Sequence, residues 1–220
     1  ILLYLKIFSI KMENISNIYL TDYIPTIYTT PCTMQYTQNG KTIERGIFAE
    51  RNGVLIIVYN KTQNVLTLVK QFRAAAYLGC IPEQDRKGII DTEKYPPRLG
   101  ITLEFCAGLE DKNVPTEQIA REEILEECGY DVPLEKLEKV CTYKNLTETT
   151  GARTTMFYCE VTDDMRVSKG GGVDDELIEV MEMPVEKDKI ANPYVMLVVL
   201  NGKKFKCLVD TGSACTIIRK

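Results

Sequence analysis

The sequence predicts an α/β (α+β) fold, in which a mixed β-sheet packs against flanking helices. Val54 to Tyr59 (VLIIVY) form a continuous apolar run, which is typical of a strand buried on both faces. Asn39-Gly40 lies between two short β-like runs and favours a tight hairpin turn. Residues 116–128 follow a helical pattern, and Gly129 is placed to end that helix. These observations indicate a domain that combines a β-hairpin, a central buried strand and a helix.

The composition fits one soluble globular domain and excludes several classes of function. The chain has 220 residues, of which 45% are hydrophobic and 26% are charged, and this length is enough to bury a core. Its net charge of −4 offers no basic surface for nucleic acid. Histidine is absent, so acid–base or metal chemistry has to use Asp, Glu, Lys, Tyr or Cys.

The cysteines are scattered, and none forms a CxxC pair, which argues against a zinc site. Several lie inside apolar runs as small hydrophobic side chains, so we expect a reducing, cytoplasmic location. The eight are Cys32, Cys80, Cys106, Cys128, Cys141, Cys159, Cys207 and Cys215.

The first 50 residues divide into a leader and a β region. Residues 1–11 are apolar, but Lys6 interrupts them and they are too short to span a bilayer, so we expect no membrane association. No basic segment precedes the run and no clear cleavage site follows it, unlike a signal peptide. We therefore expect an artefactual or disordered leader, with Met12 as the natural start. Residues 12–50 carry the β-like runs around Asn39-Gly40 and predict an N-terminal antiparallel sheet.

Strands and loops alternate from residue 51 onward. Residues 65–73 follow the buried run as the next strand, and Arg73 stands at its end. Segment 80–100 is rich in Pro, Lys and acidic residues, and we interpret this long excursion as a rim beside the substrate or a partner chain. Further strands are predicted at 101–105, 139–143, 154–161 and 176–180, with a glycine loop at 169–175 before the last.

Three glutamates mark the helix as a candidate metal site. Glu123, Glu126 and Glu127 are spaced at i, i+3 and i+4, so a helix places them on one face. Like charges on one face repel each other, and a divalent cation such as Mg²⁺ removes that cost because it accepts carboxylate oxygens. The spacing alone fits a solvated acidic face equally well.

The same stretch resembles the Nudix box, a glycine followed by a spacer and a glutamate-rich helix. The positions that match are Gly108, Glu123, Ile124, Glu126, Glu127, Gly129 and Tyr130. Two positions depart, because Val114 stands where the family has Glu and Glu122 stands where it has Arg, with Arg121 one place early. In the family these two residues brace the loop against the helix. We therefore expect this loop to lack its brace while the metal-facing glutamates remain.

The similarity extends beyond the box, from about residue 18 to residue 186. Segments 66–79, 101–110 and 151–160 resemble the ADP-sugar and UDP-sugar pyrophosphatases, and the UDP-glucose subgroup most. The resemblance implies a Nudix α/β/α sandwich over residues 51–190. It also implies a homodimer built with the sheet of residues 12–50, although the sequence fits a single-chain sheet equally well.

The resemblance further implies a reaction and a role for each site residue. The expected reaction is the Mg²⁺-dependent (or Mn²⁺-dependent) hydrolysis of UDP-glucose to UMP and glucose 1-phosphate, with ADP-ribose as another substrate. The metal ligands would be Glu123, Glu126, Glu127, the Gly108 carbonyl and, on the strand before the box, Glu104. Arg73 and Arg153 would bind phosphates, although a surface ion pair would also explain Arg73. Glu176, after the glycine loop, is the predicted general base.

Residues 191–220 do not fit this family. Residues 194–209 are predicted to form a β-hairpin with an Asn201-Gly202 turn. The following Asp210-Thr211-Gly212 segment resembles the start of a retroviral-type aspartic protease. Such enzymes need two carboxylates that share a proton, and only one copy is present here, so we expect a truncated and inert fragment.

Two other functions compete with the hydrolase. Loss of the loop brace and of the usual last helix would suit a non-catalytic module that binds sugar nucleotides. Alternatively, the chain would be part of a longer polyprotein that contains an aspartic protease.

Overall fold

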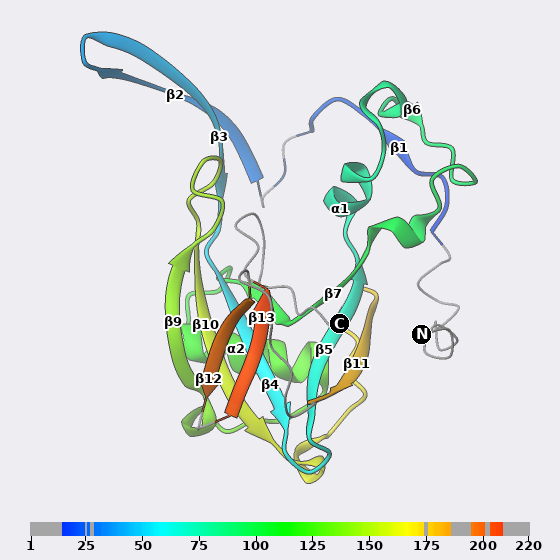
Figure 1. Ribbon diagram of the computed structural model, residues 1–220, viewed down its shortest axis with the longest axis vertical. Coiled ribbons are helices and arrows are strands. Elements are labelled where there is room, and N and C mark those ends of the chain that lie inside the picture. Colours follow the sequence, from blue (N-terminus) through cyan, green and yellow to red (C-terminus); the bar gives the residue numbers. More distant parts are fainter. Residues whose placement is uncertain are drawn as a thin grey trace.

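The centre of the molecule is a seven-stranded mixed sheet. The computed structural model describes residues 15–24, 26, 29–173, 176–185, 195–200 and 203–208, the last two ranges by their backbone alone. The strand order is β11-β5-β4-β10-β9, with β7 beside β5 and β8 beside β4 (Figure 1). β10 pairs with β4 in parallel, and the other pairs are antiparallel. The strands are β4 (Gly53–Asn60), β5 (Val65–Phe72), β7 (Ile101–Glu104), β8 (Cys106–Leu109), β9 (Glu138–Lys144), β10 (Arg153–Val161) and β11 (Ile178–Pro184).

Strand β4 is buried on both faces, as its unbroken apolar run predicts. Its alternate side chains point to opposite sides of the sheet, as the pleat requires. Val54, Ile56 and Val58 belong to the core that also holds the helix residues Ile119 and Ile124. The intervening Leu55, Ile57 and Tyr59 belong to a second core on the other side of the sheet. The predicted α/β (α+β) class is therefore confirmed.

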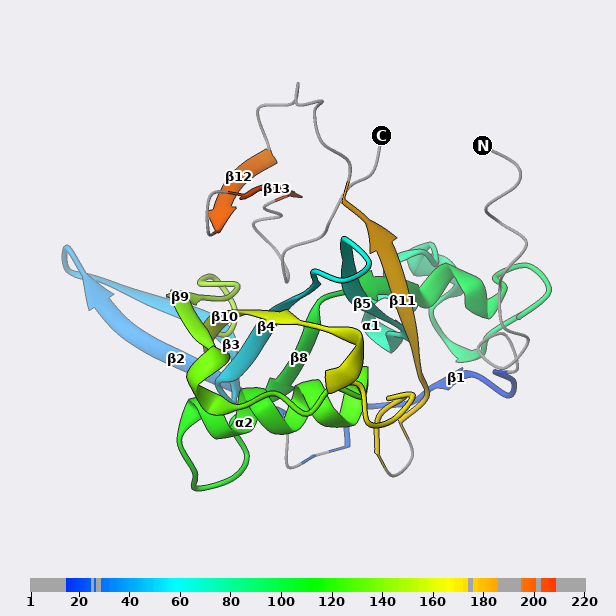
Figure 2. The same cartoon turned by 90° about the horizontal axis from the view of Figure 1, so that it is seen from below.

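One long helix covers a face of this sheet. α2 (Thr116–Glu123) continues into a π-helical turn, η4 (Ile124–Cys128), and ends where Gly129 adopts a left-handed φ of 79°. Figure 2 shows this helix on one side of the sheet and the β12–β13 pair on the other. The helix end at Gly129 is as predicted, whereas the π turn is not a feature that the sequence pattern indicated.

The predicted N-terminal hairpin is present and projects from the body of the molecule (Figure 1). β2 (Thr29–Gln38) pairs with β3 (Lys41–Glu50), and Gln38 lies opposite Lys41. Asn39 and Gly40 both have positive φ, as a two-residue hairpin turn requires. Nearly every residue of the two strands is exposed, because they form a sheet of their own.

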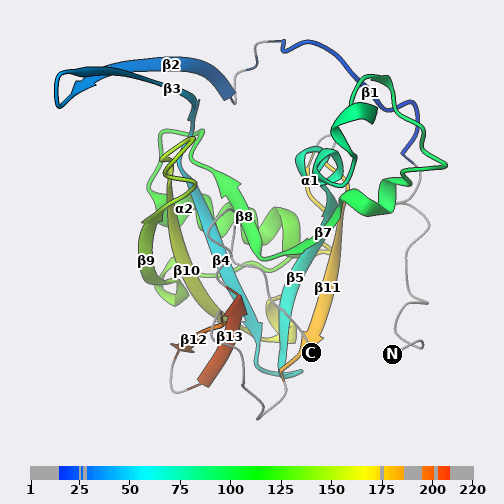
Figure 3. The same ribbon diagram turned by 45° about the horizontal axis from the view of Figure 1, so that its top comes forward.

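A small helical and looped region lies beside the strand ends (Figure 3). α1 (Ala74–Gly79), which the sequence did not predict, follows β5 directly. β1 (Tyr19–Leu20) pairs with β6 (Gly88–Ile89) from the predicted excursion 80–100. Tyr77, Ile81 and Ile90 form a separate small core here. The other short turns of the chain are η2 (Glu83–Asp85), η3 (Pro97–Gly100), η5 (Leu134–Lys136) and η6 (Asp163–Met165).

The C-terminal part contains two paired strands, as predicted. β12 (Val195–Leu200) pairs antiparallel with β13 (Lys203–Leu208), and Leu200 lies opposite Lys203. The predicted leader 1–11, the Asn201-Gly202 turn and the segment from Asp210 onward lie outside the described residues.

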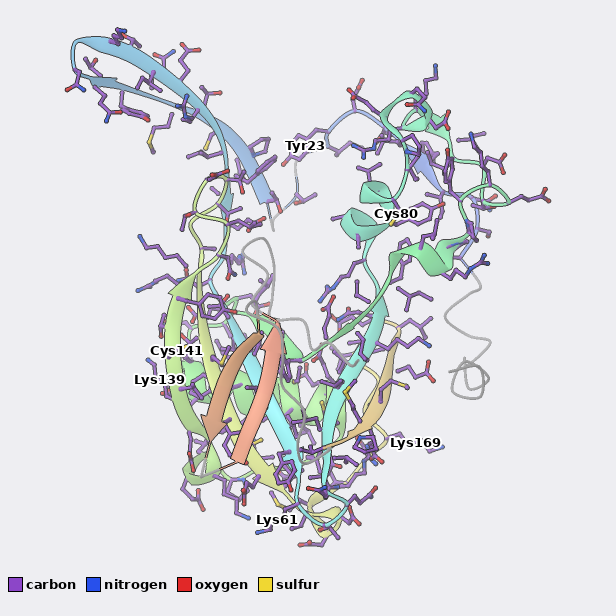
Figure 4. The ribbon with its side chains drawn as sticks, in the orientation of Figure 1. Tyr23, Lys61, Cys80, Lys139, Cys141 and Lys169 are labelled. Atoms are coloured by element: carbon purple, nitrogen blue, oxygen red, sulfur yellow. The ribbon has the colours of Figure 1, made fainter. Side chains whose placement is uncertain are left out.

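Two further findings concern the described residues only. The six cysteines whose side chains are described are free, and Figure 4 shows Cys80 beside α1 while Cys141 lies on β9. None of the helices in this part of the chain has the length and apolar character needed to cross a bilayer.

Candidate active site

Glu127 is the most deeply placed carboxylate of the helix. It is only 4% exposed, and its Oε2 accepts a hydrogen bond from the Ala107 N–H on β8 at 3.0 Å. Burial raises the pKa of Glu127 to about 7, and the charge of Glu176 adds to this effect. The hydrogen bonds from Ala107 and Cys106 and the charge of Arg73 oppose the rise in pKa. Glu127 is therefore a buried carboxylate held toward the end of β8.

Glu123 lies one turn earlier and packs directly against Gly108. A Cβ atom at position 108 would overlap the Glu123 carboxylate, so a larger residue there would displace this carboxylate. The pKa of Glu123 is raised to about 8. Burial is the largest cause, and the negative charges of Glu127, Glu126 and Glu176 raise it further. The predicted acidic helix face therefore exists, with Glu123 against Gly108 and Glu127 against the neighbouring Ala107, while Glu126 is linked to Glu123 by charge repulsion.

The π turn shapes the end of this acidic row. The Gly129 N–H points to the carbonyl oxygens of both Ile124 and Leu125, so one residue more than usual is accommodated in the turn. The free carbonyls of Glu127 and Glu126 accept hydrogen bonds from the N–H groups of Gly171 and Gly172, at 3.0 and 3.1 Å. The glycine loop thus closes the C-terminal end of the helix.

This loop also brings in Glu176. The Val173 N–H lies 3.4 Å from Glu176 Oε2, and the carboxylate is exposed. Its charge raises the pKa of both Glu123 and Glu127, so it lies within electrostatic reach of the helix carboxylates. The structure therefore places the predicted general base with the predicted metal ligands.

Arg73, directly after β5, and Glu104, at the end of β7, form a bidentate ion pair. Arg73 Nη2 lies 2.7 Å from Glu104 Oε2, and Arg73 Nε lies 3.1 Å from Oε1. Burial disfavours the ionised Glu104, but hydrogen bonds from Arg73 and Thr102 outweigh it and hold the pKa of Glu104 below its usual value. The charge of Arg73 also lowers the pKa of Glu127, so this pair borders the helix carboxylates.

Two residues that sequence reasoning missed hold Glu104 in place. Thr102 Oγ1 donates to Glu104 Oε1 at 2.6 Å, and Gln71 Nε2 donates to Oε2 at 3.3 Å. Thr102 precedes Glu104 by two residues, so the strand period places both on one face and would have indicated this contact. Gln71 faces Thr102 across the β5–β7 pair, which only the strand register reveals.

Arg153 is not brought to the carboxylates by any contact in the structure. It stands exposed at the start of β10, opposite Lys144, and its backbone N–H donates to Asn52 Oδ1 at 3.0 Å. Its guanidinium forms no ion pair with a described residue. The predicted phosphate-binding role of Arg153 therefore gains no support from its position.

The Glu-and-Arg pair of the family is absent, as expected, but a different ion pair joins the loop to the helix. Lys112 Nζ lies 2.6 Å from Glu122 Oε2, and Gln118 Nε2 donates to Glu122 Oε1 at 2.9 Å. The cation is on the loop and the carboxylate is on the helix, the reverse of the Glu-and-Arg pair of the Nudix motif. Arg121 instead binds Asp131 Oδ1 at 2.6 Å, beyond the helix end.

The donor set suits a hard divalent cation, although the side chains are not gathered as a ligand set. Among the described residues, no three acidic or cysteine side chains converge in the way that would hold an ion as they stand. The half-buried Glu123 and Glu126 and the buried Glu127 nevertheless form a cluster of like charges, to which the exposed Glu176 adds its own. A bound Mg²⁺ or Mn²⁺ would offset this repulsion, since such ions take carboxylate oxygens.

Comparison with known proteins identifies the class of protein that carries this site. The chain is 37% identical over 188 residues to the bovine (Bos taurus) uridine diphosphate glucose pyrophosphatase NUDT14, covering 80% of this chain and 84% of the bovine protein. The mouse (Mus musculus) protein of that name is 33% identical with the same coverage. A GDP-mannose pyrophosphatase of Salmonella typhimurium is 36% identical over 155 residues, 68% of this chain and 70% of the bacterial protein. No protein-family model matches the chain.

These relatives are all pyrophosphatases of nucleotide-linked sugars. At this identity and coverage, the chain belongs to the Nudix family of sugar-nucleotide pyrophosphatases.

Proposed function

We propose that this enzyme hydrolyses the diphosphate of UDP-glucose to UMP and glucose 1-phosphate in a Mg²⁺-dependent reaction. The observation that carries the proposal is the row of mutually repelling carboxylates, Glu123, Glu126 and Glu127, of which Glu123 packs against Gly108 and Glu127 binds the Ala107 N–H. The similarity to the bovine and mouse UDP-glucose pyrophosphatases supports the choice of substrate. ADP-ribose and GDP-mannose are the alternative substrates, the latter because of the Salmonella relatives.

The residues that would hold the metal are Glu123, Glu126, Glu127, the Gly108 carbonyl and Glu104. When bound, Mg²⁺ or Mn²⁺ supplies positive charge that neutralises and polarises the diphosphate oxygens. Glu104 meets this role only if it shares its oxygens with Arg73, because both now accept hydrogen bonds from that guanidinium.

The protein groups then position the substrate and move one proton. Arg73, which is 46% exposed despite its ion pair, has N–H groups left to bind a phosphoryl oxygen. Glu176 accepts the proton of the attacking water as the water oxygen bonds to phosphorus. The bond from that phosphorus to the bridging oxygen breaks, and the bridging oxygen leaves with the other phosphate. Most of the acceleration comes from positioning and charge stabilisation.

A substrate panel tests the proposal. Purified protein is incubated with UDP-glucose, GDP-mannose or ADP-ribose and Mg²⁺, and phosphate is measured after a coupled phosphatase that acts only on the products. We expect release from UDP-glucose that EDTA abolishes and added Mg²⁺ restores. Binding of the sugar nucleotides without turnover of any of them would refute catalysis and favour the non-catalytic binding module.

We also propose that the enzyme is a homodimer that uses the β2–β3 hairpin. An isolated two-stranded hairpin is at best marginally stable in water, and this one exposes Met34, Tyr36 and Phe48. Light scattering after size-exclusion chromatography should give twice the 25.0 kDa of one chain. A monomer mass at micromolar concentration would contradict the proposal.

A further inference from the structure

Lys112 lies in the loop that joins β8 to α2, beside the row of carboxylates. Its Nζ is 2.6 Å from Glu122 Oε2, and its side chain is 51% exposed. Glu122 directly precedes Glu123 and lies four residues before Glu126, so the ion pair holds the lysine beside the acidic helix face. In agreement with this position, the charge of Lys112 opposes the rise in the pKa of Glu123. Lys112 is therefore close to the acidic helix face as well as to its ion-pair partner.

Two cations thus border the site from different elements. Arg73, at the end of β5, pairs with Glu104, and its charge lowers the pKa of Glu127. Lys112, in the loop between β8 and α2, pairs with Glu122, the residue before Glu123. A diphosphate carries negative charge on both of its phosphoryl groups, and one guanidinium serves only one of them well. A second protein cation, besides the proposed metal ion, would bind the other phosphoryl group, and Arg153 makes no contact that places it there.

We propose that Lys112 is a further substrate-binding residue, whose ammonium leaves Glu122 to bind a phosphoryl oxygen of the nucleotide sugar. This inference rests on the proposed function. The move costs little, because an exposed lysine–carboxylate pair is weak and the lysine side chain is flexible. Glu122 keeps a hydrogen bond from Gln118 when the lysine leaves, so its carboxylate is not left without a partner.

If Lys112 only formed the ion pair with Glu122, removing either residue would have the same effect on KM. A matched pair of variants therefore separates substrate binding from a purely structural role. Lys112→Gln and Glu122→Gln each remove the same ion pair, but only the first removes the cation. We expect Lys112→Gln to raise the KM for UDP-glucose by about tenfold or more, the loss typical of one charged hydrogen bond. Glu122→Gln should leave KM unchanged or lower it, because Lys112 is released for the substrate. Lys112→Arg, which keeps a positive charge, should recover most of the lost affinity.

Each variant is also compared by its thermal midpoint, which should fall equally and slightly in the two Gln variants. Equal KM values for Lys112→Gln and Glu122→Gln would overturn this inference but not the proposed function. A KM for Lys112→Gln like that of the wild type would do the same. If the wild-type protein turned over none of the three sugar nucleotides, the proposed function itself would fail and this inference with it.

Discussion

Glu127, a proposed metal ligand, should lower the free energy of unfolding of the metal-free protein. The substitution Glu127→Gln tests this. The side chain is 4% exposed, and its pKa is raised from 4.5 to about 7 in the folded chain. At about 1.4 kcal/mol per pKa unit, the ionised carboxylate costs the metal-free fold about 3 kcal/mol near pH 8. Glutamine keeps an oxygen to accept the Ala107 N–H but carries no charge.

We therefore expect Glu127→Gln to increase the free energy of unfolding by about 3 kcal/mol at pH 8.5 in EDTA. The gain should shrink toward pH 5, where the wild-type carboxyl is protonated in the folded chain. The same variant should lose Mg²⁺-dependent turnover of UDP-glucose, because a proposed metal ligand is gone. Urea titrations at both pH values and the coupled phosphate assay measure the two effects.

Glu122→Gln is the matched control on the same helix. Hydrogen bonds from Gln118 and Lys112 lower the pKa of Glu122, so its removal should destabilise the protein, by at most about 1 kcal/mol for an exposed ion pair. A Glu127→Gln protein that is less stable than the wild type at pH 8.5 in EDTA would refute the electrostatic reasoning. Full activity in that variant would refute the metal-ligand role.

Three further predictions follow from the site. In EDTA, the free energy of unfolding should rise as the pH falls from about 8 toward 4.5, because folded Glu123, with a pKa of about 8, binds more protons than the unfolded chain; a flat profile in urea titrations would contradict this. Gly108→Ala should lower both the thermal midpoint and kcat, since a Cβ there overlaps the Glu123 carboxylate, whereas Gly79→Ala, which has open space, should change neither; equal effects of the two substitutions would count against the packing argument. Arg73→Lys should raise the KM for UDP-glucose and leave the circular-dichroism spectrum unchanged. The single ammonium of lysine cannot make the bidentate contact with Glu104 and also bind a phosphoryl oxygen. An unchanged KM would show that Arg73 does not bind the substrate.

Much of the central fold is predictable from sequence because burial and turn chemistry act locally. The run from Val54 to Tyr59 is unbroken because both faces of β4 are buried, so no position is left for a polar residue. Asn39-Gly40 is a reliable turn signal, because these two residues tolerate the positive φ that the hairpin requires. Helix α1 was missed, since six residues leave too short a pattern to separate from the preceding strand.

The sequence predicted those parts of the candidate site that depend on residue spacing within one helix. It did not predict the parts that depend on contacts between different elements. The i, i+3 and i+4 spacing placed Glu123, Glu126 and Glu127 on one face. The π turn depends on hydrogen bonds from the distant glycine loop, which no local pattern contains. The Lys112–Glu122 brace was missed because the motif led us to look for a carboxylate on the loop and a cation on the helix.

The proposed function depends most on whether Glu123, Glu126 and Glu127 hold a divalent cation. The direct measurement is the anomalous scattering of manganese in crystals soaked with Mn²⁺, with crystals of Glu127→Gln as the comparison. We expect a peak beside Gly108 that is bound by oxygens of these glutamates, at distances near the ~2.1 Å typical of small hard cations. The peak should be lost or weakened in the variant. Carboxylates that face solvent with no peak between them, in crystals that bind Mn²⁺ elsewhere, would contradict this expectation.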